Sequence, residues 1–278
     1  MSPTPLHGIV ALRMVTRDID RLARFYGEAI GAIADGDAVA ISPDEQVVLR
    51  SGGAVRRRLL VGGFPIELDR FDSDGRLYPV EADAADLRFQ HFAVIVHDAM
   101  AAFDRATACG AIPISRGGPV TLPASSGSVT AVKLRDPEGH PFELLQFPAS
   151  ADNRWRAVEP NALGVLGIDH SAISVADAVR SRAFYVEAGL VAKDATINEG
   201  LTQEVLDGLS LQAVDVVPLL PPVETPHLEL LGYRGVLRVP AAGLHVTDVA
   251  ATRLVWASDR DGLLCDPDGH LHQTVLAN

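Results

Sequence analysis

The sequence predicts an α+β fold built from four copies of one unit, each a strand, a helix and further strands, with the fourth copy truncated. Three observations predict this fold. A strand with a glutamate inside it occurs three times, an aspartate suited to a helix N-cap follows the first strand of each copy, and a turn of the form Asp-Pro-(Glu/Asp)-Gly-His occurs twice. An internal repeat of this kind determines the fold before any single motif does.

The stretch Arg135–Phe147 contains the clearest copy of the turn and of the strand that follows it. Proline presets φ and glycine allows positive φ, which is the chemistry of a turn. Residues 142–147 then alternate as a strand, and Glu143 lies inside this otherwise apolar segment. A buried carboxylate is costly unless it is paired or binds a metal, so Glu143 is a candidate ligand. The corresponding positions of the other copies are Glu67, Glu229 and Gln273.

The first half of the chain contains two copies. Residues 10–15 alternate as a strand, and the helix after the N-cap Asp18 ends at Gly31. Residues 37–71 are expected to form strands, and the polar residues 72–86 a connection. For the second copy we expect a strand at 91–96, a helix at 100–109 after the N-cap Asp98, and strands at 129–134 and 142–147.

The second half repeats the pattern, but its last copy is shorter. Asp98 precedes the turn residue Asp136 by 38 positions, whereas Asp259 precedes Asp266 by 7, so about one helix and one strand are missing. In the third copy we expect a strand at 168–175, a helix at 178–188 after the N-cap Asp177, and strands up to Tyr233. The predicted organisation is a first module at 1–150, a linker at 151–166 and a second module at 167–278.

Composition narrows the class of protein. With 278 residues and 47% hydrophobic side chains, the chain is long and apolar enough for two globular domains. A formal charge of -12 argues against nucleic acid or an anionic membrane as partner, and no apolar run approaches the roughly 18 residues of a membrane span. The two cysteines, Cys109 and Cys265, provide neither a disulfide framework nor a thiolate zinc site. A cytoplasmic enzyme or binding protein for a small molecule is therefore expected.

Histidines accompany two of the strand glutamates at matched positions. His91 and His170 each lie seven residues before the N-cap aspartate of their copy, and the same count gives Ala11 in the first copy and Thr252 in the fourth. One such histidine alone is more often a structural residue. Two histidines in the same register, each with a glutamate in its copy, favour a metal site. The candidate ligands are His91, Glu143, His170 and Glu229.

The other candidates have structural interpretations. Glu67 lacks a histidine partner and is expected to be a remnant or an edge carboxylate. His140 and His270 lie in turns, where structural roles are common. His272 is one residue out of register with the strand glutamates and should point to the opposite face of its strand. His227 fits no pattern and is expected to be solvated.

The repeated pattern resembles the vicinal oxygen chelate superfamily, which includes glyoxalase I, methylmalonyl-CoA epimerase, extradiol dioxygenases and fosfomycin- and bleomycin-resistance proteins. The resemblance is carried by residues 168–177, by Phe184-Tyr185, by the three Glu-Leu strands and by both Asp-Pro turns. It implies that βαβββ units pair, that their sheets curl into cups, and that metal ligands come from the first and last strands of each unit.

The resemblance also implies a reaction. Two imidazoles and two carboxylates suit a catalytic Zn²⁺, Ni²⁺, Co²⁺, Mn²⁺ or Fe²⁺. The set matches bacterial glyoxalase I, which implies a metal-dependent lyase or isomerase that stabilises an enediolate of a small substrate with vicinal oxygens. Glu143 or Glu229 would then move a proton between neighbouring carbons.

Two other classes stay open. Two histidines and one glutamate could form the facial triad of an extradiol-type, ring-cleaving dioxygenase. A metal-free protein that binds a small molecule, as in bleomycin resistance, is the second alternative. None of the arginines lies in a motif that assigns it to the carboxylates of glutathione, and both a monomer and a homodimer are compatible with the tandem chain.

The pairing of the units decides whether a complete site exists. If each module closes on itself, neither module has all four ligands. If the second unit pairs with the third, one cup contains His91, Glu143, His170 and Glu229, and the cup of the first and fourth units has no site. We predict this crossed pairing, with the Cα atoms of His91 and His170 within about 10 Å of each other, as two ligands of one ion require.

Overall fold

The computed structural model describes residues 4–210, 213–224, 226–236, 238 and 243–277. The first unit comprises β1 (Gly8–Val15), α1 (Ile19–Ile30), β2 (Ile33–Ala34), β3 (Val39–Ala40), α2 (Pro43–Leu49), β4 (Ala54–Val61) and β5 (Phe64–Phe71). The second comprises β6 (Gln90–Val96), α3 (Ala99–Ala108), β7 (Ile112–Pro113), β8 (Val120–Thr121), the 3-10 helix η1 (Ala124–Ser126), β9 (Thr130–Arg135) and β10 (Pro141–Gln146).

The 3-10 helix η2 (Arg154–Ala157) lies in the connection between the halves. The third unit comprises β11 (Val165–Ser174), α4 (Ala178–Glu187), β12 (Val191–Ala192), β13 (Thr196–Asn198), α5 (Leu201–Asp207), β14 (Ala213–Leu220) and β15 (His227–Arg234). The fourth is reduced to β16 (Arg253–Ser258), β17 (Gly262–Cys265) and β18 (Leu271–Leu276). Residues 253–277 are all described and contain no helix, as the shortened spacing predicts.

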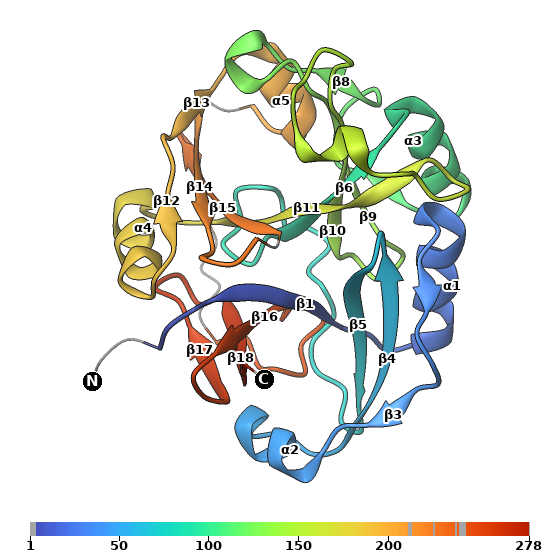
Figure 1. The fold of residues 1–278 in the computed structure, drawn as a ribbon, viewed down its shortest axis with the longest axis vertical. Coiled ribbons are helices and arrows are strands. Elements are labelled where there is room, and N and C mark those ends of the chain that lie inside the picture. Colours follow the sequence, from blue (N-terminus) through green and yellow to red (C-terminus); the bar gives the residue numbers. More distant parts are fainter. Residues whose placement is uncertain (1–3, 211–212, 225, 237, 239–242, 278) are drawn as a thin grey trace.

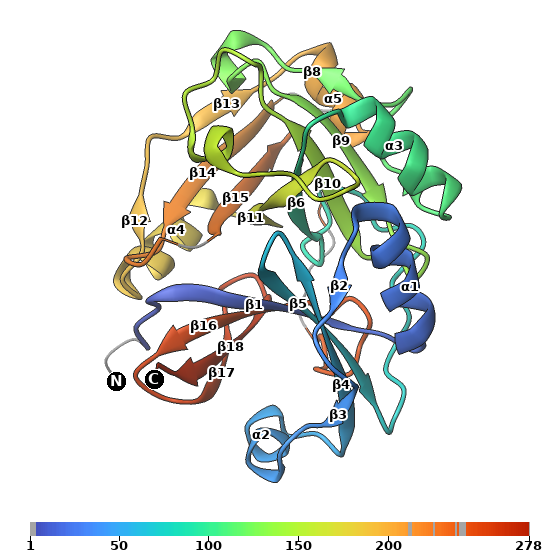
Figure 2. The ribbon, with the colours of Figure 1, turned by 45° about the vertical axis from the view of Figure 1, so that its right-hand side comes forward.

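The strands form two curled sheets, one above the other in Figure 1. The upper sheet has the order β12-β14-β15-β11-β6-β10-β9-β7, and the lower sheet the order β17-β18-β16-β1-β5-β4-β2. At the centre of each, two first strands pair antiparallel, and each has the last strand of its own unit as a parallel neighbour (Figure 2). The crossed pairing is therefore confirmed, and each sheet contains strands from both 1–150 and 167–278.

Helix α1 shows why the repeated sequence folds as it does. The side chain of Asp18 accepts a hydrogen bond from the backbone N–H of Arg21, and Gly31 ends the helix at φ 67°. One face of the helix, including Leu22 and Tyr26, is buried against the sheets. Asp98 and Asp177 cap α3 and α4 in the same way. The repeated aspartates thus start the helices that cover the sheets.

Two predicted strand regions contain a helix that the sequence analysis missed. Helix α2 lies within residues 37–71, where Ser42 caps the N-terminus and Pro43 occupies the first turn, and α5 lies in the third unit. A serine followed by a proline and acidic residues is a typical helix start, so the sequence does contain a signal for α2. Both helices are short, at seven residues each, so their hydrophobic periodicity is weak evidence.

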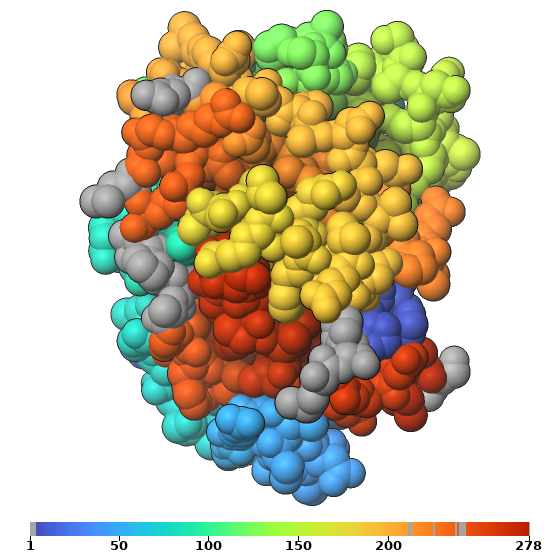
Figure 3. All heavy atoms as spheres, turned by 90° about the vertical axis from the view of Figure 1, so that its left-hand side faces the viewer, coloured from blue at the N-terminus to red at the C-terminus, as the bar shows by residue number. Residues whose placement is uncertain are grey.

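The Asp-Pro turns join units that belong to different sheets. Asp136 of the second unit accepts a hydrogen bond from the Tyr26 hydroxyl at 2.7 Å, and Asp266 of the fourth accepts one from Tyr185 at 2.9 Å. In Figure 3 the yellow segment around α4 accordingly lies against the red C-terminal strands. His140 bonds Asp136 and a backbone carbonyl, which is the structural role expected of it. None of the described helices is long and apolar enough to cross a membrane.

Candidate metal centre

Three of the four predicted ligands meet at the centre of the upper sheet. Ala93 on β6 pairs with Glu143 of β10 on one side and with His170 of β11 on the other, while His91 lies two residues earlier on β6. Residues two apart on a strand share a face. The pairing of second and third units therefore brings both histidines and Glu143 to one place, on three adjacent strands.

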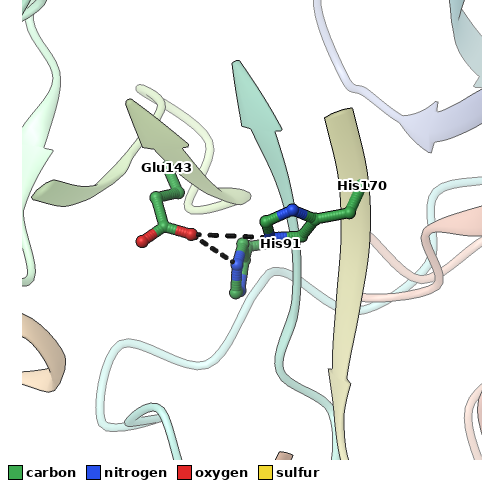
Figure 4. A group of neighbouring side chains, drawn as sticks. All are labelled: His91, Glu143 and His170. Atoms are coloured by element: carbon green, nitrogen blue, oxygen red, sulfur yellow. Dashed lines mark hydrogen bonds and ion pairs between the residues drawn. The ribbon is translucent and has the colours of Figure 1, made fainter. Parts of the chain in front are cut away.

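The donor atoms of these three side chains converge (Figure 4). His91 Nε2 lies 3.1 Å and His170 Nε2 lies 3.7 Å from the same oxygen of Glu143, Oε2. The potential ligand atoms of the three residues all lie within 4.8 Å of one another, and all three side chains are buried. Two atoms bound to one ion at roughly 2.1 Å lie no more than about 4.2 Å apart. The arrangement thus fits a divalent transition metal with only small adjustments, and it is a candidate His/Glu metal site.

Glu229 lies next to this group and contacts two histidines. Its Oε2 lies 3.6 Å from His170 Nε2, and its Oε1 lies 3.3 Å from His227 Nε2. His227 pairs with His170 across β15 and β11, and their rings are 5.3 Å apart between centroids. His227 is thus part of the cluster and only partly exposed, so the expectation of a solvated residue is wrong. Its position two residues before Glu229 was a readable signal, because the two share a strand face.

Asp169 is a further member that the sequence analysis missed. The pairing of β11 with β6 shifts register between Ile168 and His170, so Asp169 lies in a β-bulge. A bulge redirects side chains that simple alternation would place on opposite faces. Asp169 Oδ2 lies 3.2 Å from His170 Nδ1, and its other oxygen accepts a hydrogen bond of 2.8 Å from the Trp155 indole N–H. Asp169 can thus orient His170 with Nε2 towards Glu143.

The surroundings shift the pKa values of the two histidines in opposite directions. Burial lowers the pKa of His91, and the hydrogen bond with Glu143 offsets this only in part. Burial also acts to lower the pKa of His170, but the charge of Glu229 and the hydrogen bonds with Asp169 and Glu143 outweigh it and raise that pKa well above its ordinary value. Burial would raise the pKa of Glu143, but its hydrogen bonds with His170 and His91 lower it instead. The carboxylates are therefore ionised and ready to bind a cation.

A cavity of about 360 Å³ opens beside the cluster. It is bounded by the loop around η1, by α5 and by strands of the upper sheet. Its floor contains His91, Glu143, His170 and Glu229, and its walls include Leu122, Leu145, Leu206, Leu231, Lys133 and Gln203. A concave, largely apolar space with a few convergent polar groups is the usual form of a small-molecule site.

The equivalent positions of the lower sheet contain ion pairs instead. Ala11 has no ligating atom, and Glu67 is buried rather than at an edge. Glu67 accepts a hydrogen bond of 2.5 Å from Arg13 Nε, and Arg13 also contacts Glu45 of α2 at 2.8 Å. Burial would raise the pKa of Glu45, but hydrogen bonds from Arg56 and the charge of Arg13 lower it to about 2. The carboxylates here are neutralised by arginines.

The first-strand position of the fourth unit is Arg253, not the predicted Thr252. In the β16–β18 ladder Gln273 pairs with Val255, and the residue two positions before this pair, where the second unit has its histidine, is Arg253. Counting seven residues back from Asp259 gives the wrong position, because Asp259 does not cap a helix and its distance from the first strand is therefore not fixed.

A guanidinium thus occupies a ligand position of the lower sheet. Arg253 is fully buried, and its Nη2 donates to Asp69 at 2.7 Å. Asp69 also accepts from Arg56 Nε at 2.6 Å. Among the described residues, two groups of side chains could hold a metal ion, and both lie in the upper sheet: His91, Glu143 and His170, and the overlapping group Asp169, His170 and His227.

Two further histidines of the fourth unit lie away from any site. His270 bonds the backbone carbonyl of Ser174 at 2.9 Å, which is a structural role. His272 is fully buried between the Tyr185 hydroxyl at 2.7 Å and the Trp256 indole N–H at 3.2 Å. It therefore points to the core, opposite to the ligand face, as predicted.

Comparison with known proteins supports this architecture. Glyoxalase I from Zea mays has the same fold, with a TM-score of 0.59 and 18% identity over 97% of this chain and 92% of that one, and a mutant of that enzyme gives 0.61. A putative dioxygenase from Bacillus subtilis gives 0.54 and 12% identity over 98% of this chain and 86% of that one. Identities this low establish the fold and nothing finer. No curated protein sequence matches the chain.

A family model also matches the sequence of this chain. Residues 10–145 match the glyoxalase-like domain family, a segment that spans the first two units. The chain belongs to the vicinal oxygen chelate superfamily, and it has the glyoxalase-like fold over nearly its whole length.

Proposed function

We propose that this protein is a metal-dependent lyase or isomerase of the glyoxalase type, acting on a small molecule with two adjacent oxygens. The observation that supports this most is the convergence of His91, Glu143 and His170 at a cavity of about 360 Å³. A divalent metal held by these residues would supply a Lewis acid to the two substrate oxygens. Zn²⁺, Ni²⁺, Co²⁺, Mn²⁺ and Fe²⁺ all suit such ligands.

The two glutamates are assigned different roles. Glu143 contacts both histidines and is more buried than Glu229, with 6% of its side chain exposed against 19%, so we assign it mainly to holding the metal. Glu229 also lines the cavity, where it contacts His170 and His227. We assign Glu229 to the proton transfer, first as base and then as acid, with His227 fixing its orientation. Glu143 remains the alternative base.

One alternative is favoured by a specific observation. One of the two groups whose potential ligand atoms lie within 4.8 Å of one another consists of two histidines and one glutamate, His91, His170 and Glu143, which is the composition of a facial triad for Fe²⁺. An extradiol-type dioxygenase would consume oxygen when supplied with a catechol and Fe²⁺. Oxygen uptake under these conditions, absent in His91→Ala, would favour this reaction over the lyase.

The remaining alternative is a metal-free binding protein. Elemental analysis of protein purified without chelator separates it from both enzymes, since only the enzymes should retain or take up a divalent metal. We further propose that the chain acts as a monomer, because one chain already contributes both pairs of units. Its free cysteines suit a reducing compartment such as the cytoplasm.

A further inference from the structure

A buried cation lies beside the candidate metal centre. Lys133 on β9 pairs directly with Glu143 across the β9–β10 ladder and lines the same cavity, with 3% of its surface exposed. Burial acts to lower the pKa of Lys133, but the charges of Asp207 and Glu143 outweigh it and raise that pKa. The side chain is therefore a charged ammonium. One of its three N–H groups donates a hydrogen bond to Asp207 Oδ1 at 2.5 Å, which leaves two donors for other partners.

Gln203 lies next to this ammonium. It stands one turn before Asp207 on α5, and its Nε2 donates to Asp207 Oδ2 at 2.6 Å. An ionised carboxylate only accepts hydrogen bonds, so this contact fixes the amide with its oxygen directed away from Asp207. Gln203 Oε1 is buried and has no hydrogen-bond partner among the described residues. Buried acceptors are seldom left unpaired in folded proteins.

The two groups form a fixed donor–acceptor pair. Lys133 and Gln203 bind the two oxygens of the same carboxylate, and both side chains line the cavity. Of the described residues that line the cavity, Lys133 is the one lysine or arginine. The rest of the wall is largely apolar. Outside the His/Glu cluster, the cavity therefore offers one ammonium and one unpaired amide oxygen, together with the polar side chains of Ser125, Ser126, Thr196 and Asn198.

We propose that Lys133 and Gln203 recognise the acid end of a small hydroxy acid. The ammonium binds a carboxylate oxygen, and Gln203 Oε1 accepts a hydrogen bond from the hydroxyl group. This inference rests on the proposed function, because the rest of the substrate faces the His/Glu cluster. A glutathione conjugate has two carboxylates, and the cavity offers one lysine for them. The substrate class is accordingly a compact anion rather than a tripeptide conjugate.

The test compares three small ligands of similar size on the full-length protein. Lactate has both the charge and the hydroxyl, lactamide lacks the charge, and propionate lacks the hydroxyl. Binding is measured by ligand-observed NMR titration on chelator-treated protein and on Zn²⁺-loaded protein. The chelator-treated arm matters because lactate can also bind a metal directly.

Two variants isolate the pair. Gln203→Leu removes the free acceptor and leaves Lys133 with its partner. Lys133→Met is combined with Asp207→Asn so that no unpaired carboxylate remains buried. A matched control is Arg88→Met with Asp86→Asn, which removes a comparable ion pair of 2.5 Å that does not line this cavity. Circular dichroism checks that each variant is folded.

We expect wild-type protein to bind lactate at least tenfold more tightly than lactamide in both metal states. The double variant at 133 and 207 should lose this preference, and Gln203→Leu should lose the preference for lactate over propionate in the chelator-treated protein. The control should keep both. Equal binding of acid and amide by wild type, or preferences that survive in both variants, would overturn the proposal. Failure of the proposed metal site would instead abolish zinc uptake and leave the ligand preferences of the chelator-treated protein intact.

Discussion

The imidazole rings of His91 and His170 lie edge to face with their centroids 5.8 Å apart, although the two residues come from different halves of the chain. They meet because β6 and β11 pair antiparallel at the centre of one sheet. Two complete His/Glu pairs therefore face one cavity within a single chain.

The first prediction separates the two sheets. His91→Ala or His170→Ala should weaken metal binding by more than about a hundredfold, the upper end of what loss of an outer partner alone costs. Glu67→Gln should leave metal affinity almost unchanged, because Glu67 is engaged by Arg13 in the other sheet. Competition with a chromophoric chelator measures both. An equal loss at Glu67 would mean that the lower sheet contributes to the site.

The second prediction concerns Asp169. Asp169→Asn should lower metal affinity by roughly 10–100-fold, because the carboxylate that orients His170 is lost while all first ligands remain. The d–d spectrum of the Co²⁺-loaded variant should also change. Asp215→Asn, which breaks a surface ion pair with Arg234, serves as the control. Wild-type affinity and an unaltered spectrum in Asp169→Asn would show that the contact has no orienting role.

The third prediction is a pH dependence. The pKa of His170 is raised well above its ordinary 6.5, so its protonated form stabilises the metal-free fold. This contribution is fully present below pH 6.5 and is lost as the pH rises through the raised pKa. Metal must displace that proton, so its affinity should increase over the same range. Thermal unfolding against pH, with and without Zn²⁺, measures both effects. A zinc affinity independent of pH above 6.5 would be incompatible with a protonated His170.

The fourth prediction concerns the lower sheet. Arg253→Met should destabilise the protein by about 3 kcal/mol, the low end for breaking a buried ion pair, because Asp69 keeps its contact with Arg56. Metal binding should be unaffected. Urea unfolding gives the free energy of unfolding, and Arg260→Met, at an exposed contact with Thr4, is the control. If Arg253→Met matched that control in stability, Arg253 would not be a structural substitute for a ligand.

The sequence predicted the repeat, the crossed pairing and the face of His272, because these depend on periodicity and on matched spacing. Glu143 was predicted because a carboxylate inside an apolar strand is costly to bury without a partner. The same argument applies to the charged Lys133 in the neighbouring strand, which was not singled out. Asp169 was out of reach, since a β-bulge is not visible in alternation. Arg253 was missed because the count relied on a helix that the fourth unit lacks. Helices α2 and α5 were too short for periodicity to reveal.

We expect one metal site, shared by the second and third units. The most direct measurement is elemental analysis of the purified protein after loading with Ni²⁺, Zn²⁺ or Fe²⁺, followed by anomalous diffraction to locate the ion. About one equivalent per chain is expected, bound between His91 and His170 with Glu143. Two equivalents, no uptake of any of the three metals, or an ion in the lower sheet near Glu67 would contradict it.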